Sequence, residues 1–179
     1  MTTSDHEHRK ALEALYVQHE RGLYNVAYRY TWSAEDARDV VHDAFVRLWR
    51  KRASIDWPRA SGLAYRTVLG LAANRRRGNA VRRLFGARDH AEPLERAADE
   101  LLAEARADAA VRRCIDRLPE ALRSALVMCA FSELDYAAIG AVLGLPSGTV
   151  GSRRNTAIAR IRAELELQRP RDGERSGHG

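Results

Sequence analysis

The sequence predicts an all-α fold of two small helical domains joined by a flexible acidic linker. Apolar residues recur at helical spacing, and no stretch alternates apolar and polar residues for long enough to form a sheet. Arginines cluster at residues 75–83 and 153–162, whereas residues 89–108 carry seven acids and two arginines. We therefore expect domains at 8–80 and 108–167, a linker at 81–107 and a disordered tail at 168–179.

The first domain is predicted to contain three helices. Residues 8–30 carry apolar side chains at helical spacing. Ser33 has the side chain of an N-cap, and Asp36 in the following turn suits the positive end of a helix. This second helix is expected to be broken at Pro58. A third helix is expected from about residue 60 to residue 77, with arginines at its C-terminal end.

The second domain is predicted to be helical from residue 109, after a short helix near 94–107 in the linker. Pro119 opens its next helix. The stretch "YAAIGAVLGL" predicts a short helix that Gly144 ends in the left-handed conformation. Its inward side chains are expected to be Tyr136, Ile139, Val142 and Leu143. Pro146 then leads into "SGTV", where Ser147 can cap the next helix and Val150 anchors it, which is the layout of a helix-turn-helix.

Polar and basic side chains gather at the start of the second helix of this helix-turn-helix. Hydroxyls and backbone amides there can hold phosphates, and arginine suits bidentate reading of guanine. The predicted DNA contacts are Ser147, Thr149, Ser152, Arg153 and Arg154. A helical hairpin with a solvated basic face is the alternative.

Composition narrows the class of protein. A formal net charge of +6 and a pI near 9.8 favour a polyanionic partner. No run of eighteen apolar residues is present, and "MTTSDHEHRK" lacks the features of a secretion signal, so we expect a cytoplasmic protein without direct membrane insertion. Cys114 and Cys129 lie among apolar residues and are interpreted as core thiols.

No enzyme signature is found in the sequence. It contains no glycine-rich phosphate loop, no cysteine or histidine pairs at zinc spacing and no nucleophile elbow. His6 and His8 in "DHEH" are interpreted as part of a polar terminal segment rather than as metal ligands. We expect no catalysis by this chain, no cofactor and no metal.

Two longer stretches resemble the two conserved regions of bacterial sigma factors. "AEDARDVVHDAFVRLWRKR" followed by "GLAYRTVLGLAANRRRGNAVRR" resembles region 2, and "LPEALRSALVMCAFSELDYAAIGAVLGLPSGTVGSRRNTAIARIR" is similar to region 4. The resemblance covers roughly residues 10–80 and 108–165. Their order, the joint and the chain length look like the extracytoplasmic-function (ECF, group IV) subfamily of the sigma-70 family.

The resemblance implies that the chain binds the β′ and β subunits of core RNA polymerase and promoter DNA. It also implies a monomer when free and an anti-sigma factor as a further partner. The polymerase-binding residues carried over from the family are Asp36, Asp39, Val40, Asp43, Phe45, Leu48 and Trp49. The alternative is a solvated acidic helix face. His42 stands where the family usually has glutamine.

The resemblance also implies that region 2 melts and reads the minus-10 promoter element and that region 4 reads the minus-35 element. The minus-10 contacts would be Arg66, Asn74, Arg75, Arg76 and Arg77. The chain departs from common family residues at Leu63, Gly70, Asn74, Gly151 and Thr156. The acidic linker would follow the path of nascent RNA through polymerase, or would be a solvated spacer.

Two other functions stay open at this level. One is an autonomous helix-turn-helix transcriptional regulator, which would require a stable dimer and a symmetric operator. The other is a sigma-like interaction protein without efficient promoter binding, because the departures at residues 70, 74, 151 and 156 remove family residues.

Overall fold

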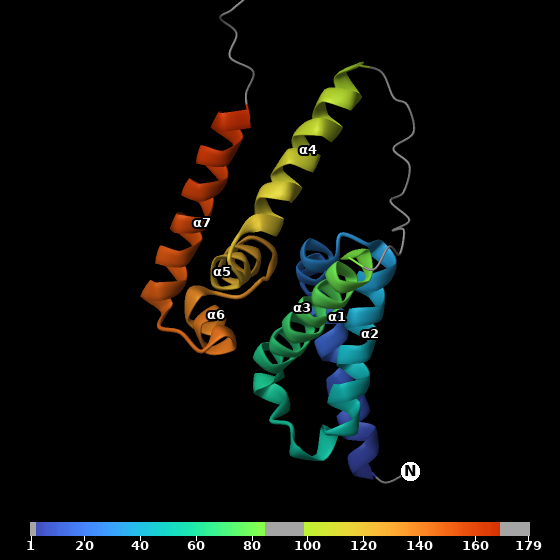
Figure 1. Cartoon of the computed structure of the whole chain (residues 1–179). Helices are drawn as coiled ribbons and strands as arrows, with labels where there is room; N and C mark the ends of the chain where they lie inside the picture. Colours follow the sequence, from blue (N-terminus) through green and yellow to red (C-terminus); the bar gives the residue numbers. More distant parts are fainter. Residues whose placement is uncertain (1–2, 85–98, 169–179) are drawn as a thin grey trace, which may run out of the picture.

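The structure, a computed structural model, describes residues 3–84 and 99–168 (Figure 1). All regular elements within these two ranges are helices, which confirms the all-α fold class. They are α1 (Thr3–Thr31), α2 (Ala34–Arg50), the 3₁₀ turns η1 (Arg52–Ser54) and η2 (Trp57–Arg59), α3 (Ala60–Leu84), α4 (Asp99–Arg117), α5 (Glu120–Phe131), α6 (Tyr136–Leu143) and α7 (Ser147–Gln168).

The first domain consists of α1, α2 and α3, which pack against one another. Ser33 caps α2 as predicted, since its hydroxyl accepts a hydrogen bond from the Asp36 amide at 3.2 Å. The apolar stripe of α2 faces the other two helices. Its buried members are Ala37, Val40, Val41, Ala44 and Leu48. This packing fixes which face of α2 remains available to a partner.

The extents of α3 and α4 differ from the sequence prediction, and α2 already ends at Arg50, before Pro58. α3 continues through Gly78 to Leu84 instead of ending near residue 77. A glycine inside a helix costs only about 1 kcal/mol, and the Asn79 side chain donates a hydrogen bond to Asp36 on α2 at 3.0 Å, which holds the added turns in place. α4 runs without interruption from Asp99 to Arg117, across the predicted boundary between the linker and the second domain. The remainder of the expected linker, 85–98, and the expected tail, 169–179, lie outside the described residues.

The predicted helix-turn-helix is formed by α6 and α7. Gly144 has a φ of 69°, so the expected left-handed end of α6 is confirmed. Val150 is fully buried and anchors α7. The carbonyl of Pro146 accepts the amides of Thr149 and Val150, so the helix starts one residue earlier than a cap at Ser147 would place it.

One inward assignment in this motif was wrong. Tyr136 is the first residue of α6 and is 46% exposed. Residues 135–137 at the start of the helix are exposed, and burial in the core begins with later residues such as Ile139 and Val142. Helical periodicity gives the face of a helix but not where along it the packing begins.

Gly140 is expected to be essential for the turn. A Cβ added there would lie 2.5 Å from the carbonyl oxygen of Leu145, a backbone atom that cannot move aside cheaply. We expect Gly140→Ala to lower the free energy of unfolding by about 1–3 kcal/mol, measured by urea denaturation of the full chain. Gly151→Ala is the matched control, because no atom lies within 4 Å of its added Cβ. Equal stability of the two variants would contradict this close approach.

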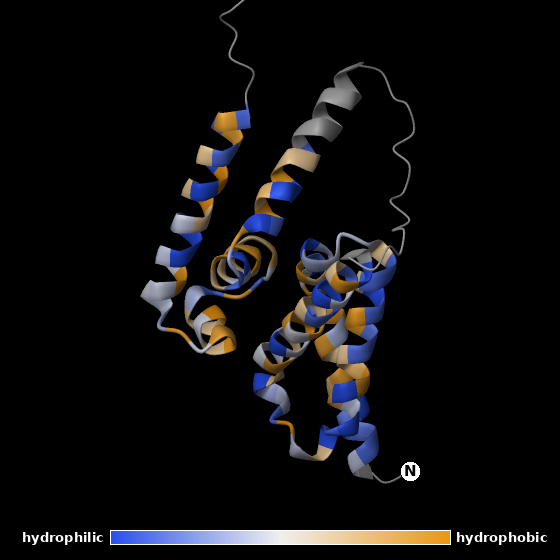
Figure 2. Ribbon diagram, in the orientation of Figure 1, coloured by the Kyte–Doolittle hydropathy of each residue, from blue (hydrophilic) through white to orange (hydrophobic). Residues whose placement is uncertain are grey.

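Most buried apolar residues form one cluster that includes both domains. Leu23 and Tyr65 from the first domain share this cluster with Met128, Ile139 and Val142 from the second. α3 packs against α6, and α1 packs against α5. Figure 2 shows polar and apolar residues interleaved along the helices of both domains. The sequence predicted the two domains but not their packing on each other.

Candidate polymerase and nucleic-acid interface

The outer face of α2 presents carboxylates. Asp43 is exposed, and the side chain of Asp39 is 57% exposed, with one oxygen 3.5 Å from Arg75. Asp36 differs, because its side chain is only 19% exposed, lies 3.3 Å from the Arg75 guanidinium and accepts the Asn79 hydrogen bond. Asp39 and Asp43 are therefore the carboxylates of α2 best placed to meet a basic partner, while Asp36 ties α2 to α3.

The apolar members of the predicted polymerase-binding set divide into two groups. Val40 and Leu48 are each 2% exposed, so they lie in the core and orient α2 instead of offering contact area. Phe45 and Trp49 are half-buried. The Trp49 ring is covered by the guanidinium of Arg52 at 4.5 Å. Phe45 and Trp49 therefore give α2 a partly exposed apolar edge.

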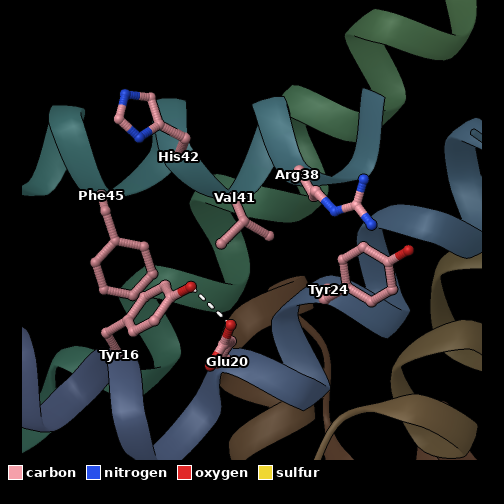
Figure 3. Close-up of a pocket in the computed structure, with 7 residues that line it drawn as sticks. All are labelled: Tyr16, Glu20, Tyr24, Arg38, Val41, His42 and Phe45. Carbon is pink, nitrogen blue, oxygen red and sulfur yellow. Dashed lines mark hydrogen bonds between the residues drawn. The ribbon is translucent and has the colours of Figure 1, made fainter. Parts of the chain in front are cut away.

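A groove between α1 and α2 adjoins this apolar edge (Figure 3). It encloses about 590 Å³ and is lined by Tyr16, Glu20, Tyr24, Arg38, Val41, His42 and Phe45. The Tyr16 ring meets Phe45 edge to face at 5.1 Å, and its hydroxyl donates to Glu20 at 2.7 Å, which raises the pKa of Tyr16. The groove was not predictable from helical spacing alone, because Tyr16 is 38% exposed and lies at the edge of the apolar face of α1.

Most of the predicted minus-10 arginines on α3 are engaged within the chain. Arg66 donates to the carbonyls of Val142, at 3.2 Å, and Ala141 at the end of α6. Arg76 donates to the Asp116 carbonyl at 2.7 Å. Arg75 pairs with the α2 acids described above. Arg77 and Asn74 are exposed and hydrogen-bonded to each other. The basic surface of α3 is thus partly covered by the second domain.

The predicted minus-35 residues lie together in the first two turns of α7. Ser147 and Ser152 are exposed, and Thr149, Arg153 and Arg154 are half-buried. They stand at the N-terminal end of α7, where the helix dipole favours an anion. This arrangement can bind a phosphate and present two guanidiniums to a base edge.

The described residues give no sign of a reactive thiol, a metal site or a membrane span. Cys114 and Cys129 are free, and burial raises the pKa of both thiols, which is typical of packed rather than reactive cysteines. Among the described residues, no three His, Cys, Asp or Glu side chains gather to hold a metal. Within the same ranges, no helix is long and apolar enough to cross a membrane.

Comparison with known proteins decides the family. Sigma-70 region 2 matches residues 15–82, and Sigma-70 region 4 matches residues 108–161. The ECF RNA polymerase sigma factor RpoE of Cereibacter sphaeroides is 31% identical over 74% of each chain. The chain belongs to the ECF sigma factors of the sigma-70 family. This family is one of transcription initiation factors and not of enzymes.

Other relatives agree with this membership. The ECF sigma factor SigE of Mycolicibacterium smegmatis is 30% identical over 91% of this chain and 65% of its own length. The chain therefore spans slightly less than two thirds of the length of that relative. SigM of Mycobacterium tuberculosis is 30% identical over 86% of this chain and 76% of its own.

Solved structures show the same fold. CnrH in complex with the cytosolic domain of CnrY superposes with a TM-score of 0.67 at 23% identity, covering 93% of this chain and 94% of that one. The sigma factor RpoE in complex with the anti-sigma factor NepR, from Bartonella quintana, gives a TM-score of 0.56 at 20% identity and covers 92% and 97%.

Proposed function

We propose that this ECF sigma factor binds core RNA polymerase and directs promoter-specific initiation of transcription. The observation that carries the proposal is the presence of both sigma-70 regions in one chain, in order. Polymerase performs the chemistry, so the chain itself catalyses no reaction and acts in the cytoplasm with the polymerase.

Polymerase docks on the exposed face of α2. Asp39 and Asp43 provide the charge, and Phe45 and Trp49 provide the apolar edge. Opposite charges across an interface mainly set the rate and specificity of association, whereas a desolvated aromatic anchor contributes most to affinity. Val40 and Leu48 act indirectly by holding α2 against α1 and α3, and Asp36 fixes α3 through Arg75.

Promoter DNA is read at two places. The arginines of α3 with Asn74 bind the backbone of the melted minus-10 strand, where positive charge follows the phosphates. The start of α7 enters the major groove at the minus-35 element, with Arg153 and Arg154 toward the bases and with Ser147, Thr149 and Ser152 toward the phosphates. An anti-sigma factor is the regulatory partner that we propose, since both solved relatives are complexes with a second protein, one of them a named anti-sigma factor.

Binding to core polymerase tests this function against an autonomous regulator. The labelled full chain is titrated with bacterial core polymerase free of sigma factors, and binding is followed by fluorescence anisotropy. We expect saturation at one chain per polymerase and competition by an unlabelled housekeeping sigma factor. A chain that is dimeric by light scattering and does not bind polymerase would instead be the autonomous helix-turn-helix regulator.

A further inference from the structure

The segment that joins α2 to α3, residues 51–59, has few contacts of its own to fix its conformation. It contains the single turns η1 and η2, and neither turn has a buried residue or a capping side chain. Ile55 and Trp57 pack against the core but are only partly buried. A segment with so little burial opens easily unless other parts of the chain hold it. We call residues 51–59 the joining segment.

The first turns of α1 contact both turns of the joining segment. Figure 1 shows the start of α1 and the loop after α2 at the same end of the first domain. At η1, the Arg52 guanidinium donates to the Asp5 carboxylate at 2.9 Å, although 47 positions separate the two residues. At η2, the Trp57 indole N–H donates to Nδ1 of His8 at 3.0 Å. We call these two contacts, Asp5 with Arg52 and His8 with Trp57, the brace.

The hydrogen bonds of His8 require the neutral imidazole. An indole N–H can only donate, so Nδ1 of His8 accepts from Trp57 and carries no proton. The proton of the neutral ring therefore lies on Nε2, which donates to the Ser4 hydroxyl at 3.2 Å. Protonation of the ring at acid pH turns Nδ1 into a donor and breaks the bond to Trp57.

The charged groups of the elements that meet at His8 form pairs of opposite sign or lie in water. The pairs are Asp5 with Arg52 at 2.9 Å, Arg9 with Glu13 at 3.7 Å and Asp56 with Arg59 at 3.7 Å. The exposed ionisable groups are His6, Glu7, Lys10 and Lys51, whose charges water screens. The bond to Trp57 is therefore the contact of His8 that acid removes.

We propose that His8 is a positioning residue for promoter reading, because through Trp57 it holds the joining segment in the conformation that presents the start of α3 to DNA. The inference rests on the proposed function, which assigns α3 to the minus-10 strand. The joining segment ends where α3 begins and carries two exposed cations, Lys51 and Arg59, the latter with 88% of its side chain exposed. Cations held at fixed spacing bind phosphates without a further cost of ordering.

Amide hydrogen exchange of the full chain tests the brace without DNA or polymerase. We expect His8→Ala to lower the protection factors of the joining segment about threefold to tenfold at neutral pH, because a hydrogen bond that closes the segment is lost. His8→Asn should restore them, since its side-chain oxygen takes the place of Nδ1 and accepts from Trp57. His6→Ala is the matched control, because His6 is an exposed histidine at the same end of α1.

The pH profile separates positioning by His8 from a general structural role. Histidine changes its charge between about pH 5 and 8, so the parent should lose protection of the joining segment on acidification to about pH 5 and approach His8→Ala. His8→Asn has no group to protonate there and should keep its protection. Equal protection of the parent and His8→Ala at neutral pH would overturn the brace. So would a parent whose joining segment stays as protected in acid as that of His8→Asn.

Run-off transcription with sigma-free core polymerase and sheared genomic DNA of the native host tests the effect on promoter reading. We expect His8→Ala to reduce the yield of discrete transcripts about threefold or more, because a smaller fraction of the chain is competent. His8→Asn and His6→Ala should match the parent, and the affinity of every variant for core polymerase should be unchanged in the anisotropy titration.

The two readouts fail in different ways. Lower protection in His8→Ala with an unchanged yield of transcripts would overturn the role in promoter reading and leave only a structural contact. Absence of discrete transcripts from the parent itself would count against the proposed function and against this role with it. The exchange measurement would then still decide the brace.

Discussion

Reversing the charge at Asp39 and Asp43 together is expected to weaken binding to core RNA polymerase by at least about 100-fold, because like charges placed across an interface cost several kcal/mol. Both side chains are on the outer face of α2. Asp39 makes one exposed ion pair with Arg75, and pairs of this kind contribute about 0–1 kcal/mol to stability. Asp39→Lys with Asp43→Lys should therefore leave helix content unchanged by circular dichroism.

The control for this variant carries the same change in net charge elsewhere in region 2. Glu7 and Glu13 are exposed on α1, so Glu7→Lys with Glu13→Lys raises the charge equally without altering α2. Affinity for polymerase is measured by the anisotropy titration. If both double variants lose affinity to the same extent, only net charge matters and the α2 docking surface is misassigned.

Replacing Arg153 and Arg154 with alanine is the second change expected to have a large effect. A good bidentate arginine–guanine contact is worth about 1–3 kcal/mol, so the loss of two such contacts should reduce transcription from a minus-35-dependent promoter by about 30-fold or more. Polymerase binding through α2 should be retained, because α2 belongs to the other domain.

Arg160 and Arg162 provide the matched control for this loss. They are exposed on the same helix, two turns after the proposed contacts, and their replacement by alanine removes the same charge. We expect the control to reduce transcription only slightly, because Arg160 and Arg162 contribute mainly a salt-dependent attraction to DNA. The recognition helix would be wrongly assigned if the two double variants lost transcription to a similar extent. The same conclusion would follow if Arg153→Ala with Arg154→Ala left transcription unchanged.

Local signals in the sequence were sufficient for the helices and for the start of α2 and the end of α6. Ser33 caps α2 by a hydrogen bond to the nearby Asp36 amide, and Gly144 ends α6 through its own backbone angle. Both features are local in the sequence, so both were predictable. The end of α3 was not predictable, because Asn79 holds it through a carboxylate on α2 that lies 43 positions earlier. Contacts of that kind leave no periodic pattern in the sequence.

The candidate site divides in the same way. The residue types of the docking and DNA-binding surfaces follow from motif positions, but their availability depends on packing between domains. The family resemblance assigned Val40 and Leu48 to the polymerase-binding set and could not show that both side chains are buried in the core. Likewise, nothing local in the sequence indicates that Arg66 binds α6 or that Trp32 contacts α4.

The most direct test of the central claim is run-off transcription with sigma-free core polymerase, the full chain and sheared genomic DNA of the native host, with the 5′ ends of the transcripts mapped. A sigma factor that reads two elements should give discrete new start sites, each preceded by two shared sequence blocks near minus-10 and minus-35. Background ends alone, although polymerase binds the chain, would contradict promoter recognition and favour a sigma-like interaction protein.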